Sequence, residues 1–324
     1  MLYLVYRSIL LSLMKSTILV GGQAVIEGVM MRVPGSYATA VRQSNGEVVL
    51  DYHKFNSKVA SNNFFSLPII RGMIHLYESM SIGYKTLEWS AKISEPDQKT
   101  NKFIDILLSI VSLIFSLGLF VGLPIISADF FQKFLLESNT LIFNLTSGLV
   151  RIIIFLSYLI LISYMKDIKR LFQFHGAEHQ TVYNFESGKS LTIENAKKFP
   201  KEHPRCGTSF IFIVMLVSII SYSFIDSLAI SIGINLTIIK RLLIHIPCLP
   251  LVAGFSYEVL KLSAKYKNYF FFKVLGYPGL MLQKITTQVP SEEQLEVAIA
   301  ALKNAFGDNL KKYEGKEFSA EAVG

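Results

Sequence analysis

The sequence has 324 residues, of which 51% are hydrophobic and 17% are charged, and its mean hydropathy is +0.42. Soluble domains carry about 25% charged residues, so this composition favours an integral membrane protein over a soluble one. The net charge is +8, but no basic run is interleaved with aromatic residues, so we expect the lipid bilayer, and no nucleic acid, as a partner. Two cysteines are too few for the disulfide framework of a small secreted protein.

The N-terminal region predicts a small cytoplasmic α+β element within residues 1–102. The segment Met1–Met14 is apolar but lacks the basic start and cleavage site of a signal peptide, and we expect Met14 to be the native start. Two β-rich runs flank Asn45-Gly46, which is a strong hairpin signal. In residues 67–93 apolar side chains recur every three or four positions, which predicts a helix. Its apolar face would pack on the hairpin or lie on the bilayer surface.

Four later segments are long and apolar enough to cross a bilayer. The second contains Arg151 and the fourth contains His245, and ionisable residues inside a span face the bundle or a polar cavity. Near the C-terminus, Ser291 and Gln294 form the capping box of a further helix. The predicted fold is a mostly α, polytopic membrane protein with about four transmembrane helices. The expected regions are the N-terminal region (1–102), a first helix pair (103–165), a polar segment that forms a cytoplasmic His-rich loop (166–208), a second helix pair (209–260) and a cytoplasmic C-terminal helical region (261–324).

The distribution of positive charge predicts the topology. Lysine and arginine are abundant before the first span, in the polar segment and after the fourth span, whereas the two remaining connections carry few. Positively charged connections stay in the cytoplasm. We therefore expect both termini and the polar segment to face the cytoplasm, with the protein in the inner membrane of a bacterium. A homo-oligomer is compatible with this arrangement.

The polar segment contains the residues that indicate chemistry. His175, Glu178 and His179 follow the order H-x-x-E-H, which places two imidazoles on one face of a helix. In zinc peptidases with this order the histidines bind the metal and the glutamate activates water. His203 and Cys206 are a second pair of candidate ligands, since zinc prefers imidazole and thiolate. The alternative is a solvated helix whose polar groups pair with lysines.

Further polar candidates lie elsewhere in the sequence. Glu27 is either a functional carboxylate or the ion-pair partner of Arg32. If Glu178 is itself a metal ligand, Glu27 or Glu258 becomes the candidate general base. We expect the Glu27 carboxylate to lie within bonding distance of one of three residues, namely His175, His179 or Arg205.

Several long motifs resemble those of the YqhQ-like bacterial multi-pass membrane proteins, a family of unknown function described as predicted metal-dependent enzymes. The resemblance runs from about residue 16 to residue 306 and leaves out only the leader and the end of the chain. It implies a metal-dependent membrane enzyme whose site includes the H-x-x-E-H residues. The matching stretches are GGQAVIEGVMMR (21–32), HGAEH (175–179), HPRCGTSF (203–210), PLVAGFSYE (250–258), PGLMLQKITTQ (278–288) and EVAIAAL (296–302).

Three functions are compatible with these patterns. The first is a metal-dependent hydrolase in which the four candidate ligands hold a divalent cation, zinc foremost, and Glu178 is the general base. Aromatic residues and the adjacent bilayer favour a lipid-linked or membrane-delivered substrate for it. The second is a non-catalytic scaffold in which four protein ligands close the coordination sphere. The third is a small transporter or channel whose polar path is lined by Arg151, His245 and Glu258.

The predicted topology has a direct test. A reporter fused after Leu136 should lie outside the cytoplasm, because this connection is poor in positive charge. Paired fusions to alkaline phosphatase and green fluorescent protein measure the side, since the first is active only outside and the second fluoresces only inside. A cytoplasmic result at Leu136 would overturn the topology.

Overall fold

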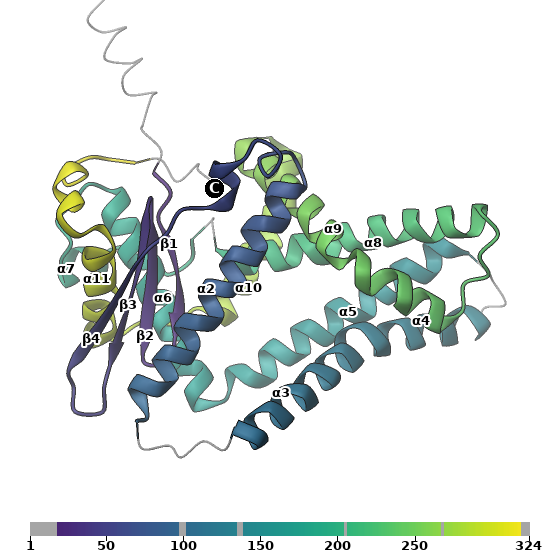
Figure 1. Cartoon of the computed structure of the whole chain (residues 1–324), viewed down its shortest axis with the longest axis horizontal. Helices are drawn as coiled ribbons and strands as arrows, with labels where there is room; N and C mark the ends of the chain where they lie inside the picture. The colour runs from purple at the N-terminus through teal and green to yellow at the C-terminus, as the bar shows by residue number, and fades with distance from the viewer. Residues whose placement is uncertain (1–17, 97–101, 135–138, 204–205, 267–268, 319–324) are drawn as a thin grey trace, which may run out of the picture.

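Among the residues that the structure describes, four helical segments are long and apolar enough to cross a membrane, which confirms the predicted fold class. The computed structural model describes residues 18–96, 102–134, 139–203, 206–266 and 269–318. The long helices extend to one side as a bundle, and a small antiparallel sheet with its own helices lies at one end of that bundle (Figure 1). The four segments are Phe103–Phe134, Thr140–Ser163, Phe210–Ser231 and Ile238–Ser263.

The bundle is built from consecutive apolar helices. The first span consists of α3 (Lys102–Leu117) and α4 (Leu123–Phe134), joined by a π-helical turn, η2 (Gly118–Gly122). Helix α5 packs on α4 and on α8, and α8 packs on α9. Helix α9 continues through its two prolines rather than breaking at them. The bounds of these three helices are α5 (Thr140–Ser163), α8 (Gly207–Ser231) and α9 (Ile238–Lys265).

The sheet is an antiparallel meander in the order β1-β2-β3-β4. The predicted hairpin is β3–β4, with Gly46 at a positive φ of 88° in its turn. The hairpin β1–β2 was not predicted, because its turn holds Glu27 at a φ of 53° and contains neither glycine nor asparagine. The bounds are β1 (Gly21–Val25), β2 (Gly28–Val33), β3 (Ser36–Arg42) and β4 (Val48–Lys54).

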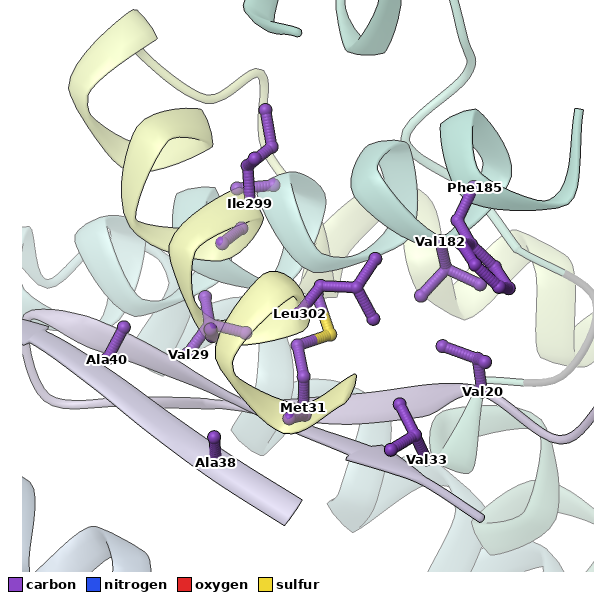
Figure 2. Close-up of a cluster of buried hydrophobic side chains, with 14 of the residues drawn as sticks. Val20, Val29, Met31, Val33, Ala38, Ala40, Val182, Phe185, Ile299 and Leu302 are labelled. Carbon is purple, nitrogen blue, oxygen red and sulfur yellow. The ribbon is translucent and has the colours of Figure 1, made fainter. Parts of the chain in front are cut away.

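Alternation along β2 decides which helices cover each face of the sheet. One face packs on α6 (Lys166–Glu186) and α11 (Glu292–Phe306), and its apolar core is shown in Figure 2. There Met31 of β2 faces Leu302 of α11, while Val182 comes from α6. The other face carries Met30, which packs with Ile82 of α2 (Ile70–Ser94). We call the sheet with α2, α6, α7 (Ile193–Ala196) and α11 the head.

Two parts of the chain differ from expectation in their secondary structure. The segment between the second and third spans is mostly helix, because α6 occupies its first half. Helix α10 (Phe270–Thr286) lies in the expected C-terminal helical region, although only the helix after Ser291 had a local signal; it packs mainly on α8. The capping box of Ser291 and Gln294 at the start of α11 is formed as predicted.

Helix α2 does not bury the apolar stripe that the sequence predicted. Tyr77, Met80 and Tyr84 are 64%, 66% and 70% exposed, so they do not pack on the hairpin. Small residues make the contact with the bundle instead, since a Cβ on Gly72 would lie 2.8 Å from the carbonyl oxygen of Gly254 in α9. The other alternative, that the stripe lies on the bilayer surface, stays a prediction.

This helix contact generates a stability prediction. Gly254→Ala should destabilise the protein by about 1–3 kcal/mol, because the new Cβ would lie 2.5 Å from the backbone oxygen of Ile69. Gly276→Ala in α10 is the matched control, since no atom lies within 4 Å of its Cβ position. Thermal unfolding in detergent measures both. If the two variants melt at the same temperature, the close contact of α2 with α9 is wrong.

Candidate metal centre

Three side chains from two segments meet at one end of the head. A nitrogen of His175, a nitrogen of His179 and the sulfur of Cys206 lie within 4.8 Å of one another. The histidines are one turn apart on α6, as their spacing predicted, and Cys206 Sγ lies 3.2 Å from His175 Nε2. In a tetrahedral zinc site, with bonds of about 2.3 Å to sulfur and 2.0 Å to nitrogen, such atoms are roughly 3.5 Å apart. The donor set and its spacing therefore fit a zinc-type ion.

Two backbone carbonyl groups orient the imidazoles. The oxygen of Thr286 lies 2.8 Å from His175 Nδ1, and that of Lys201 lies 2.5 Å from His179 Nδ1. Because a carbonyl oxygen only accepts hydrogen bonds, each Nδ1 carries the proton and each Nε2 keeps a lone pair for a metal. Burial lowers the pKa of His179, which also keeps that ring neutral.

The end of α10 also fixes the segment that leads to Cys206. The side chain of Gln283 accepts a hydrogen bond from the backbone N–H of His203 at 2.7 Å and donates one to its carbonyl oxygen at 2.9 Å. Lys201 Nζ donates to the carbonyl oxygen of Thr287 at 2.7 Å. No local pattern in the sequence indicates this support, because each contact joins a side chain to a backbone group that is 80 or more residues away.

Glu178 is buried beside the three-atom cluster. It is 5% exposed, and its Oε2 lies 3.4 Å from His179 Nε2. The edge strand β1 crosses over it at Gly22, where a Cβ would lie 2.9 Å from Glu178 Cγ and 2.3 Å from the carbonyl oxygen of Met30. A residue with a side chain does not fit at this crossing. Gly22 therefore allows β1 to lie directly against the Glu178 side chain.

These groups line a cavity of about 770 Å³. Its walls come from β1, β2, the segment around Ser57, α2 and α6, and from Gly207. Because Gly207 begins α8, the cavity lies where the head meets the bundle. The sequence-predicted candidates that line it are Arg32, His175, Glu178, His179, His203 and Cys206.

His203 lines the cavity but lies outside the three-atom cluster. Its Nε2 is 3.4 Å from Glu186 Oε2, and its ring centroid is 5.7 Å from that of His179. Burial lowers the pKa of His203 to about 4, so the ring is neutral at pH 7. Among the described residues, three of the four expected ligands therefore meet, and the fourth lies beside them.

Glu27 does not lie at the cluster. Both oxygens of its carboxylate bind the Arg170 guanidinium on α6, so the expected pair with Arg32 is not formed. Within the described chain the carboxylate forms no hydrogen bond or ion pair with either histidine of the cluster, so the prediction depends on its third member. Its third expected neighbour, Arg205, lies outside the described residues. The place of Glu27 in the β1–β2 turn explains the difference, because that turn lies beside Arg170, which precedes His175 by more than one turn of α6.

Two other candidates take part in separate ion pairs. Glu258 of α9 binds the Arg71 guanidinium and accepts the backbone N–H of Ile69 at 3.2 Å, which fastens α2 to the bundle. His245 lies inside the bundle, where its Nε2 is 2.9 Å from Asp226 Oδ1. Neither residue lines the head cavity.

A family model described as "Protein of unknown function (DUF1385)" matches residues 67–308, which is most of the chain. The chain belongs to this family. It is also 32% identical over 296 residues to the "Uncharacterized protein YqhQ" of Bacillus subtilis (strain 168), which covers 86% of this chain and 89% of that protein. These matches confirm the resemblance inferred from the motifs. No solved structure matches the chain significantly.

The three-atom cluster predicts which residues hold metal. Protein purified without chelators should contain about one zinc or similar ion per chain, and His175→Ala and Cys206→Ser should each lose it, because each removes one of three ligands. His203→Gln should keep the metal, since His203 lies outside the cluster. Plasma mass spectrometry against protein concentration measures the content. Full metal content in Cys206→Ser, or loss in His203→Gln alone, would contradict the arrangement.

Proposed function

We propose that this protein is a metal-dependent hydrolase that acts at the membrane surface. The observation that carries the proposal is the burial of Glu178 in the same cavity as the three candidate ligand atoms. Three protein ligands leave one tetrahedral position open, which is typical of catalytic rather than structural zinc sites. A carboxylate beside an open position is the usual general base for water in such sites.

The bound ion, Glu178 and the two histidines would have separate roles in the reaction. A bound zinc-type ion supplies Lewis acidity and lowers the pKa of water toward neutrality. Glu178 accepts the proton that water loses as its oxygen attacks the substrate, and then returns that proton to the leaving group. His175 and His179 keep their orientation during these steps, because backbone carbonyl groups hold their Nδ1 atoms.

The geometry favours this function over the two alternatives. A closed structural site needs a fourth protein ligand, and in the described chain His203 is engaged with Glu186 rather than with the cluster. A transport path through Arg151, His245 and Glu258 would need these residues to share a channel. Arg151 and His245 line one cavity of about 180 Å³ in the bundle, but Glu258 is not among its lining residues.

The position of the cavity supports a substrate that arrives from the membrane. Gly207, the first residue of a membrane-spanning helix, forms part of the wall. Much of the remaining wall is apolar, including Leu19, Val20, Phe55 and Ile82. Together with the charge distribution, this supports a lipid-linked or membrane-delivered substrate on the cytoplasmic side of a bacterial inner membrane.

The general base has a specific test. Glu178→Gln should keep the bound metal but lower turnover by about 10²–10⁴-fold, since it removes only the proton acceptor. Zinc-loaded protein in lipid nanodiscs would be assayed against chromogenic carboxyl esters, phosphate esters and fluorogenic peptides. Metal content of the same samples is measured in parallel.

Matched variants identify the base. Glu88→Gln changes an exposed carboxylate of α2 that pairs with Lys92, and it should leave turnover unchanged. Glu258→Gln tests the alternative base and should act through stability, not through proton transfer. Wild-type turnover in Glu178→Gln, or no hydrolysis of any substrate by zinc-loaded wild type, would refute the proposal.

A further inference from the structure

Arg32 is a cation that the proposed chemistry does not use. It lies on β2 next to Met31, and strand alternation turns it to the face that carries Met30, opposite the core of α6 and α11. Its guanidinium lies over the Phe55 ring, with Cζ 4.3 Å from the ring centroid. Arg32 also lines the cavity that holds the candidate metal ligands.

In the described part of the chain, the N–H donors of the Arg32 guanidinium are free to bind a ligand. A guanidinium has five N–H donors, and within the described residues those of Arg32 form no hydrogen bond or ion pair. The side chain is nevertheless half-buried, and burial lowers its pKa. A partly desolvated cation without a hydrogen-bonded anion favours the binding of a ligand with negative charge.

Neighbouring acids do not fill this role. Glu78 contributes a favourable charge interaction, but its carboxylate accepts hydrogen bonds from Ser57 Oγ at 2.8 Å and from the backbone N–H of Lys58 at 2.6 Å. Glu78 is not among the residues that line the cavity. The charge of Glu78 therefore offsets part of the desolvation cost of Arg32, but the N–H donors of the guanidinium stay available.

The edge strand leaves a route between Arg32 and Glu178. Gly21 is the register partner of Arg32 on β1, and no atom lies within 4 Å of its Cβ position. Gly22, the next residue, is the one over which Glu178 packs. Both glycines line the cavity, so no side chain of these two residues separates the face that carries Arg32 from the face that carries the cluster.

We propose that Arg32 binds a phosphate-type anionic group of the substrate, while the bond to be cleaved lies at the His175–His179–Cys206 cluster around the edge of β1. A planar guanidinium matches the oxygens of a phosphate in a bidentate geometry. The apolar wall between the two ends suits an amphiphile with one anionic group. The cleavage end of this inference rests on the proposed function, but binding of the anion does not require turnover.

Binding of defined probes tests the assignment. Detergent-purified protein would be titrated calorimetrically with dihexanoyl phosphatidic acid, with neutral dihexanoylglycerol and with inorganic phosphate. Wild type should bind the phosphatidic acid, and Arg32→Gln should weaken that binding by about tenfold or more without changing the affinity for dihexanoylglycerol. Arg42→Gln is the control, because Arg42 pairs with Glu296 and lies outside the cavity lining. A phosphatidic acid preference over inorganic phosphate identifies a lipid source, and equal affinities identify a free phosphate.

A second variant guards against misfolding of Arg32→Gln. Gly21→Leu keeps the guanidinium but places a side chain in the open space at Gly21, so it should also weaken phosphatidic acid binding. Unchanged affinity in both variants, or equal binding of the charged and neutral lipids by wild type, would overturn the inference. If the protein binds phosphatidic acid through Arg32 but hydrolyses no substrate, this inference stands and the proposed hydrolase function is refuted. If the protein hydrolyses a substrate but binds phosphatidic acid equally well without Arg32, the hydrolase function stands and this inference is refuted.

Discussion

The carbonyl oxygen of Thr286 accepts a hydrogen bond from His175 Nδ1, and the arrangement of the site depends on this contact. It joins the last turn of α10, an apolar helix that packs on α8, to the turn of α6 that carries His175 and His179. The chain then crosses α6 closely, since a Cβ on Gly176 would lie 2.1 Å from the carbonyl oxygen of Gln288. The backbone N–H of Gln288 donates to Phe172 at 2.8 Å, which fixes this crossing. The candidate ligand His175 is therefore oriented by the same segment that joins the bundle to α11.

Ion pairs hold the elements around the site together. The pair of Arg71 with Glu258 joins α2 of the head to α9 of the bundle, and within the head the pair of Glu27 with Arg170 joins the β1–β2 turn to α6. Cys206, the residue that caps the start of α8, places its sulfur beside a pair of histidines that belong to the head. A site assembled from both parts is held by the packing of each, which is how rigid elements position reactive groups precisely. The cavity therefore lies at the junction of the head and the apolar bundle.

The sequence predicted most of the fold, because the deciding signals are local. Span hydropathy, the Asn45-Gly46 turn and the capping box of Ser291 each act within a few residues, and the structure has all of them. The spacing of His175 and His179 predicted two ligands on one helical face for the same reason. The β1–β2 hairpin was missed because Glu27 adopts a positive φ without a glycine.

Long-range features of the site could not be predicted in the same way. Nothing local to Glu27 indicates that its partner is Arg170, and nothing near His203 indicates that Glu186 takes its Nε2. The apolar stripe of α2 gave no indication that small residues, Gly72 and Gly254, make its contact with α9. The backbone oxygens that orient the ligands carry no residue-type signal at all.

X-ray absorption spectroscopy at the metal edge tests the central claim most directly, because it reports ligand type and distance without a substrate. The account predicts a tetrahedral zinc-type ion with one sulfur at about 2.3 Å, two imidazole nitrogens at about 2.0 Å and one light atom from solvent. The imidazole scattering should fall in His179→Ala, and the sulfur shell should vanish in Cys206→Ser. A sphere closed by three imidazoles and one sulfur, or a well-folded protein that binds no metal, would contradict it.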